Sequence, residues 1–299
     1  MSPTPADAAE QARWLLLGLG TVTALNLALG LVWAFRRLVL AKPTFARTWS
    51  LLDAWLGVQL VLALLVALLA AGALVLYAAA ALFRFRVPAD IFDLRLLLPA
   101  TILQGVVFFA VPAAFIAIRY RQRLRDIGLP PLPRPRDWWA GVLLGLAAVV
   151  VFQVLGLALT GAANQFRHVE WVARALEYEK NNPVAQVIRA LPGQSPAMLL
   201  LAVLGIGVSA GLGEEMLFRG FLFNILKRRF GLAAGLVVSG LLFAAPHTYV
   251  LGLLPVFLMG LVLAWIYHNS GSLWVPVIVH ATNNSVLVLL AYFFPALST

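Results

Sequence analysis

The chain has 299 residues, of which 62% are hydrophobic and 11% are charged. Soluble globular domains are about 45–50% apolar and about 25% charged, so this composition excludes a soluble enzyme, a disordered chain and a collagen-like chain. The net charge of +10 does not indicate nucleic acid, because helical membrane proteins carry basic loops for orientation. The absence of cysteine excludes disulfides, thiolate zinc sites and cysteine nucleophiles.

The fold class that remains is an all-α, polytopic membrane protein. Eight apolar stretches approach or exceed the length of about 20 residues that a transmembrane helix needs. They cover residues 14–35, 55–83, 96–118, 138–161, 196–223, 231–247, 252–267 and 274–294. The first stretch is preceded by a leader with net negative charge and is too long for the core of a cleaved signal peptide.

The loops between these stretches alternate in charge. Segments 36–50 and 119–137 and the turn at 227–229 are strongly basic, whereas segments 84–95 and 162–195 are nearly balanced. Basic loops remain on the cytoplasmic side, so this alternation predicts that both termini lie outside. The Leu- and Ala-rich composition with short basic loops favours a prokaryotic cytoplasmic membrane.

Two further segments organise the chain. Residues 125–137 contain four prolines and are predicted to form an extended cytoplasmic linker. This linker divides the N-terminal helices (1–124) from the region that holds the remaining helices (138–299). Residues 166–180 have apolar positions at helical spacing, which predicts a helix on the outer membrane surface.

Two adjacent acids, Glu214 and Glu215, lie inside the predicted span 196–223. A charge at the centre of a bilayer costs roughly 2.5–3.5 kcal/mol on insertion scales, so intramembrane acids are functional candidates. Arg219 follows Glu215 by four positions on the same helix face, which predicts a structural ion pair. Glu214 points about 100° away and has no partner in its own helix, so it is available for proton transfer.

Later spans bring polar residues to the depth of Glu214. If the basic turn near Gly231 is a hairpin tip, Glu214 and His247 both lie roughly 25 Å from it at 1.5 Å per residue. His280 and Asn284 share one helix face and lie roughly 15–20 Å from the turn at 269–272. We therefore expect these four side chains to converge in one layer. The two histidines outside this group fall in a loop and a turn: His168 and His268.

Three ordered motifs carry a resemblance. Glu214-Glu215-x-x-x-Arg219, Phe243-x-x-x-His247 and His280-x-x-x-Asn284 resemble the motifs of the CAAX protease and bacteriocin-processing (CPBP, or abortive-infection) family of intramembrane proteases. That family includes the type II CAAX prenyl endopeptidases, and the resemblance covers about residues 195–295.

This resemblance implies an eight-helix membrane endopeptidase whose cavity opens to the membrane. It implies that Glu214 and His247 activate the attacking water and that His280 and Asn284 stabilise the oxyanion. It also implies a membrane-associated or lipid-modified protein substrate: prenylated tails, bacteriocin or pheromone precursors and C-terminal sorting tails all fit. Neither the substrate nor the oligomeric state follows from the sequence.

A zinc-dependent version of the same protease would use three of these residues as ligands. Glu214, His247 and His280 provide a Glu-His-His set with one open position. No HExxH motif occurs, however, and Asn284 is a better oxyanion donor than metal ligand. The metal-free mechanism, which needs no cofactor, is therefore favoured.

Three different classes of protein share single features of this sequence. Gly207-Val-Ser209-Ala-Gly211 matches the G-x-S-x-G pattern of serine hydrolases, but that pattern needs a strand before the serine, and G-x-x-x-G spacing favours helix packing instead. A transporter would use Glu214 as an ion site, although the first four spans lack a matching acid. A scaffold that binds partners without cutting them is disfavoured only because every motif residue is present.

Overall fold

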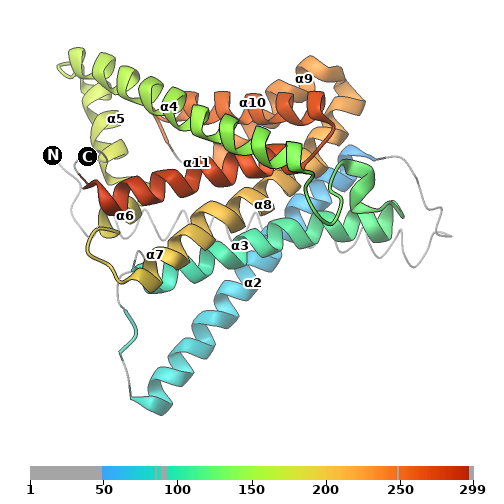
Figure 1. Ribbon diagram of the computed structural model, residues 1–299. Coiled ribbons are helices and arrows are strands. Elements are labelled where there is room, and N and C mark those ends of the chain that lie inside the picture. The colour runs from blue at the N-terminus through green and yellow to red at the C-terminus, as the bar shows by residue number, and fades with distance from the viewer. Residues whose placement is uncertain (1–48, 85, 89–92, 248, 296–299) are drawn as a thin grey trace.

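The computed structural model describes residues 49–84, 86–88, 93–247 and 249–295 (Figure 1). Every regular element in these ranges is helical, so the all-α class is confirmed. Six stretches are long and apolar enough to cross a membrane, as expected of a polytopic membrane protein. They are Leu51–Phe83, Leu94–Arg119, Pro135–Gln165, Pro196–His247, Leu253–Ser270 and Trp274–Phe293. The predicted span 14–35 lies outside the described residues.

The helices follow the predicted stretches closely. The α-helices are α2 (Leu51–Phe83), α3 (Leu94–Ala114), α4 (Pro135–Gln165), α5 (Glu170–Asn181), α6 (Pro183–Ala190), α7 (Pro196–Ala202), α8 (Ala210–Glu215), α9 (Asn224–Ala244), α10 (Leu253–Ser270) and α11 (Trp274–Phe293). The π-helical segments are η2 (Phe115–Arg119), η4 (Val203–Ser209) and η5 (Met216–Phe223), and the 3₁₀ segments are η3 (Leu124–Ile127) and η6 (Ala245–His247).

The predicted spans 196–223 and 231–247 form one helical run that reverses at Gly231. This glycine has φ 83° and ψ 174°, a backbone conformation that L-residues rarely adopt. Lys227 and Gly235, four residues before and after it, lie side by side: a Cβ on Gly235 would stand 2.9 Å from the Lys227 Cα. Farther along the same hairpin, Arg219 lies 4.3 Å from the ring centre of Phe243. The predicted hairpin is therefore present, with residues equidistant from Gly231 facing each other.

The centre of the bundle is built from α3, α8 and α11, with α4, α9 and α10 packed around them (Figure 1). Small residues permit close approach: a Cβ on Gly141 would overlap Ile278, and one on Gly145 would overlap Thr282. This G-x-x-x-G pair therefore brings α4 close to α11. Helix α2 slants away from the bundle, and many of its large hydrophobic side chains are exposed, as suits a surface that faces lipid.

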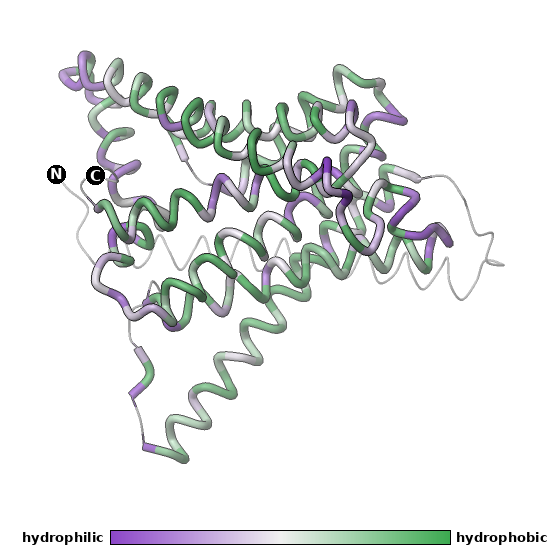
Figure 2. The backbone as a smooth tube through the Cα atoms, viewed as in Figure 1, coloured by the Kyte–Doolittle hydropathy of each residue, from purple (hydrophilic) through white to green (hydrophobic). Residues whose placement is uncertain are grey.

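The described loops gather at two opposite ends of the bundle. At one end the linker meets the start of α11, where Gly128 accepts a hydrogen bond from the Leu273 amide at 2.9 Å. At the other end the Tyr292 hydroxyl donates to the Gln194 carbonyl at 2.7 Å. Figure 2 shows hydrophobic residues along the helices and hydrophilic residues mainly near their ends. This arrangement follows the alternation of basic and balanced loops in the sequence.

Of two local predictions, one is confirmed with shifted bounds and the other is corrected. The predicted helix at 166–180 is present as α5, shifted to Glu170–Asn181. The linker 125–137 is less extended than predicted, because η3 includes its first residues and α4 begins at Pro135. Proline at the first position of a helix needs no hydrogen-bonded amide, so Pro135 starts α4 rather than belonging to a coil.

Candidate active site

The two intramembrane glutamates lie on α8, between two π-helical segments. Helix α8 packs very closely: a Cβ on Gly213 would stand 2.7 Å from the Gly105 Cα of α3, and one on Gly211 would stand 2.9 Å from the Ala281 amide of α11. The Ser209 hydroxyl donates to the Ile102 carbonyl at 3.1 Å. The G-x-S-x-G sequence is thus engaged in helix packing, as expected, and its glycines set the distance between Glu214 and the neighbouring helices.

Glu215 is fully buried and has two partners. Its Oε1 accepts from Arg219 Nη1 at 2.7 Å, which confirms the predicted ion pair. The same oxygen lies 2.9 Å from His280 Nδ1. Arg219, also fully buried, donates in addition to the Gly260 carbonyl at 2.9 Å. Sequence spacing predicted the first contact, whereas the second depends on how α11 packs against α8.

Glu214 lies next to this network without completing a hydrogen bond to it. Its Oε2 is buried, has no hydrogen-bond partner among the described residues, and stands 3.9 Å from His280 Nε2. A buried polar atom without a partner costs free energy, which points to a functional site rather than a purely structural one. His280 therefore faces both glutamates, with Nδ1 towards Glu215 and Nε2 towards Glu214.

Phe243 connects the second motif to this cluster. Its ring centre lies 5.0 Å from that of His247 and 5.6 Å from that of His280. The Nδ1 atom of His247 lies 2.9 Å from the Phe243 carbonyl, so the neutral ring donates there and leaves Nε2 unprotonated. In the described part of the chain, no hydrogen bond joins His247 to Glu214. The two residues lie on opposite arms of the hairpin, 17 positions before and 16 positions after Gly231.

Asn284 lies at the edge of the cluster rather than at its centre. Its side-chain amide donates to the Ile206 carbonyl of η4 at 3.0 Å, and its Oδ1 accepts from Asn283 at 3.1 Å. Of the four residues predicted to converge, Glu214 and His280 lie 3.9 Å apart, and His247 is linked to His280 through the Phe243 ring. Among the described residues, the contacts of Asn284 are to Asn283 and Ile206 rather than to Glu214.

The three side chains of the predicted zinc set are not gathered around one point in this conformation. Within the described residues, no three His, Asp or Glu side chains are placed to hold one together. Of the three side chains that a zinc site would need, both histidines are hydrogen-bonded through Nδ1, His280 to Glu215 and His247 to the Phe243 carbonyl, which leaves each Nε2 available as a ligand.

An apolar cavity of about 490 Å³ lies beside the glutamate helix. Its walls come from α3, the linker, α8 and α11, and include Phe109, Pro130, Leu212 and Trp274. Leu212 stands two residues before Glu214 on α8. The polar cluster is thus close in the chain to an apolar recess that the sequence did not predict.

Glu179 of α5 is a contact that sequence reasoning missed. Its carboxylate accepts from three successive amides in the loop after His247: Val250 at 3.0 Å, Leu251 at 3.3 Å and Gly252 at 2.8 Å. The Tyr249 ring in this loop stacks on His247, 6.2 Å between centres. Burial, and then the charge of Glu179, raises the pKa of Tyr249 to about 12. No spacing rule links Glu179 to a loop some 70 residues later.

Comparison with known proteins finds a family match in the second half of the chain and two similar proteins. Residues 196–286 match the family model described as type II CAAX prenyl endopeptidase Rce1-like. An uncharacterized 24.3 kDa protein of Escherichia coli is 36% identical over 165 residues, 53% of this chain and 62% of that protein. UPF0177 protein YxdF of Lactococcus lactis subsp. lactis (strain IL1403) is 32% identical over 110 residues, 35% of this chain and 59% of that protein.

The chain thus spans about 60% of the length of these two curated relatives. No solved structure matches it. The matched segment 196–286 contains both glutamates of α8, the Phe243–His247 motif and the His280–Asn284 motif. Residues 196–286 therefore resemble an Rce1-like domain of the type II CAAX prenyl endopeptidases.

Proposed function

We propose that the protein is an intramembrane endopeptidase that hydrolyses a peptide bond of a membrane-associated or lipid-modified substrate. The observation that carries the proposal is the buried, unpartnered Oε2 of Glu214, 3.9 Å from His280 Nε2, within the family-matched segment. A carboxylate in a membrane span is costly, and the ion-pair contact of Glu214 in the described residues is to His280, which is charged only when protonated, so function explains its presence better than packing does. The apolar cavity beside Leu212 supports a substrate with an apolar part.

In the proposed mechanism Glu214 takes a proton from water, and the resulting hydroxide attacks the scissile carbonyl. His247 holds the water through Nε2, because its Nδ1–H is engaged by the Phe243 carbonyl. The proton taken from water is later returned to the leaving amine by way of Glu214 and His247. Each step moves a proton between groups that lie at similar depth in the hairpin.

The oxyanion is proposed to be stabilised by His280 and Asn284. Asn284 uses one amide hydrogen on the Ile206 carbonyl and has a second to donate. His280 gives its Nδ1–H to Glu215, so it donates from Nε2 only when both ring nitrogens carry protons. In that state, the charges of Glu214, Glu215, Arg219 and His280 sum to zero. Aligned donors of this kind lower a barrier by roughly 3–4 kcal/mol each.

The finer architecture is also proposed. The described helices and the reversal at Gly231 support seven of the eight predicted spans, and residues 14–35 would supply the remaining one. The basic loops favour both termini outside, in a prokaryotic cytoplasmic membrane. The substrate is taken to be a membrane-associated protein or peptide, and the reaction to need no metal.

The test compares strains that carry the wild type or single variants, and looks for new chain ends that cleavage creates in other membrane proteins. New termini should appear with the wild type and with the exposed controls His168→Ala and Glu170→Gln, and should disappear with Glu214→Gln and His247→Ala. The same termini profile in all strains would contradict the proposal. Purified wild type should also keep its activity on the identified substrate after exhaustive chelation. Loss that only added zinc restores would favour the metal-dependent version.

A further inference from the structure

A polar cavity lies at the basic end of the bundle and is separate from the Glu/His cluster. It has a volume of about 230 Å³, several times the volume of about 30 Å³ that one water molecule occupies in the liquid. Residues from four parts of the chain line it: the segment before α2, the η3 region, the start of α9 and the end of α10. None of the lining residues belongs to the proposed catalytic group.

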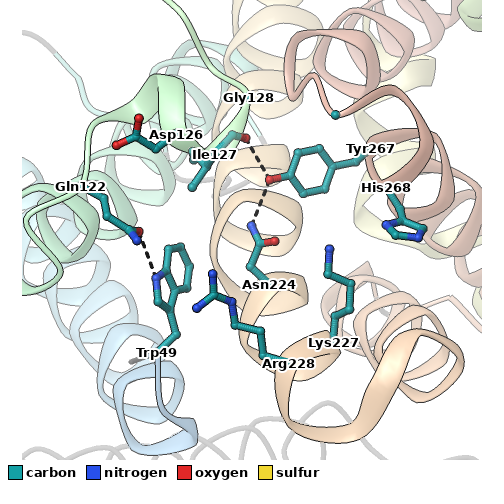
Figure 3. A pocket seen from close by; sticks show the side chains of 11 residues that line it. Trp49, Gln122, Asp126, Ile127, Gly128, Asn224, Lys227, Arg228, Tyr267 and His268 are labelled. Carbon is teal, nitrogen blue, oxygen red and sulfur yellow. Dashed lines mark hydrogen bonds between the residues drawn. The ribbon is translucent and has the colours of Figure 1, made fainter. Parts of the chain in front are cut away.

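Two cations project into this cavity without a carboxylate partner. Figure 3 shows the Lys227 ammonium and the Arg228 guanidinium directed into the space between the surrounding helices. Among the described residues, neither side chain forms an ion pair with an acid. The acid in the lining, Asp126, is engaged in its own turn, where it accepts from the Arg123 amide at 2.8 Å and lies 3.9 Å from Arg125 Nε. Within the described ranges, the positive charge of Lys227 and Arg228 is therefore uncompensated in this cavity.

Aromatic contacts hold the two cations in place without neutralising them. The Lys227 ammonium lies 5.3 Å from the centre of the Phe223 ring, and the Arg228 guanidinium lies 5.8 Å from that of Trp49. Cation–π contacts of this kind orient a charge and leave its hydrogen-bond donors available. The side chains are thus arranged before any ligand binds.

Neutral groups complete the wall. Gln122 accepts from the Trp49 indole through Oε1 at 3.0 Å, so its amide hydrogens remain to donate. The Tyr267 hydroxyl donates to the Ile127 carbonyl at 2.9 Å and accepts from Asn224 at 3.0 Å (Figure 3). These hydrogen bonds fix the wall across three separate elements. The cavity combines a rigid frame with two charged donors and one neutral donor.

We propose that this cavity binds a phosphate-bearing anion. Arg presents a planar pair of donors that matches phosphate oxygens, and Lys adds a point charge. Basic pockets between transmembrane helices on the side that carries the basic loops bind phospholipid head groups. The same chemistry would hold free inorganic phosphate, and the experiment below separates the two sources.

The experiment uses the full-length protein in detergent. Native mass spectrometry with an equimolar mixture of phosphatidylglycerol and phosphatidylcholine measures lipid binding. Thermal unfolding in inorganic phosphate, against chloride at equal ionic strength, measures binding of the free anion. The variants are Lys227→Gln, Arg228→Gln and the uncharged change Gln122→Leu. Arg229→Gln is the matched control, because Arg229 is the next basic residue of the same turn and does not line the cavity.

We expect Lys227→Gln and Arg228→Gln each to weaken binding about tenfold, because each variant loses a charged hydrogen bond. Gln122→Leu should weaken binding about fivefold, because it loses a neutral hydrogen bond. Selective binding of phosphatidylglycerol would identify the lipid, and a phosphate-dependent rise in the unfolding temperature would identify the free anion. Either result supports the site if Lys227→Gln and Arg228→Gln weaken the binding and Arg229→Gln retains it; binding that is unchanged in the first two variants would contradict it. Equal loss in Arg229→Gln, or no binding of either ligand by the wild type, would overturn the proposal.

Discussion

At the scale of single residues, one carboxylate oxygen organises the buried cluster. Oε1 of Glu215 is shared by Arg219 and His280, at 2.7 and 2.9 Å. Glu215 therefore keeps the arginine charge compensated and also fixes the orientation of the His280 ring. Glu214, one residue earlier, has neither task; in the described part of the chain, Oε2 of each glutamate is buried without a hydrogen-bond partner. The two adjacent glutamates are thus assigned different roles by their contacts.

Replacing Glu215 with Gln should reduce both stability and activity. The change leaves the fully buried Arg219 without its counter-charge, and breaking a buried ion pair typically costs roughly 3–5 kcal/mol. Unfolding of the purified variant, compared with wild type in the same detergent, measures the loss. Glu170→Gln is the control, since Glu170 pairs with Arg174 in an exposed position. An inactive variant of unchanged stability would instead place Glu215 among the catalytic groups.

The contacts of Glu215 also mark how far sequence reasoning extends at this scale. The four-residue spacing to Arg219 lies within one helix, so it was predictable from helical geometry. The His280 contact crosses 65 positions and depends on the approach of α11 to α8, which spacing alone does not encode. Asn284 follows His280 by four positions in α11, and sequence spacing did not indicate that one of its amide hydrogens donates to the Ile206 carbonyl.

At the scale of elements, glycines determine where the glutamate helix can lie. Gly213 faces Gly105 of α3, and Gly211 faces the backbone of α11 at Ala281. Without these glycines α8 would stand farther from both helices, and Glu214 would move away from His280. The small-residue pattern was readable in the sequence, but the helices it joins were not.

Gly213→Ala should therefore destabilise the protein. The added methyl group would overlap the backbone of Gly105, which cannot rotate away as a side chain does, and overpacking of this kind costs roughly 1–3 kcal/mol. Gly156→Ala in α4 is the control, because nothing lies within 4 Å of its Cβ position. Thermal unfolding of the two variants should show a lower midpoint for Gly213→Ala alone. Equal midpoints would argue against close packing of α3 on α8.

Helix α5 acts on the proposed site from outside the bundle. Glu179 accepts hydrogen bonds from three consecutive amides directly after the His247 segment. The carboxylate thereby holds a loop whose Tyr249 ring stacks on His247. A surface helix can in this way set the position of a residue in the proposed mechanism.

Glu179→Gln should loosen this loop and lower the activity. An amide side chain has one acceptor oxygen in place of two, so at least one loop amide loses its partner. We expect hydrogen exchange at residues 250–252 to accelerate about tenfold, which corresponds to roughly 1.4 kcal/mol of local stability. The control Glu170→Gln should exchange at the wild-type rate. If Glu179→Gln also exchanges at the wild-type rate, contacts other than Glu179 hold the loop.

At the scale of the whole molecule, charge and hydropathy predicted the architecture well. The ends of the helices, the hairpin at Gly231 and the separation of basic from balanced loops follow from helix length and loop charge. The slant of α2 and the two cavities did not, because they depend on packing between segments far apart in the chain. The end that holds Lys227 and Arg228 is the one assigned to the cytoplasm.

The absence of cysteine allows this orientation to be tested cleanly. Arg125→Cys places a thiol at the basic end of the bundle, and Arg167→Cys places one after α4, at the other end; both positions are exposed. A membrane-impermeant maleimide added to intact cells should label Arg167→Cys and not Arg125→Cys, because basic loops remain in the cytoplasm. Permeabilised cells should label both, and the cysteine-free wild type should stay unlabelled. The reverse pattern would invert the molecule in the membrane, and labelling of both thiols in intact cells would contradict their location at opposite ends.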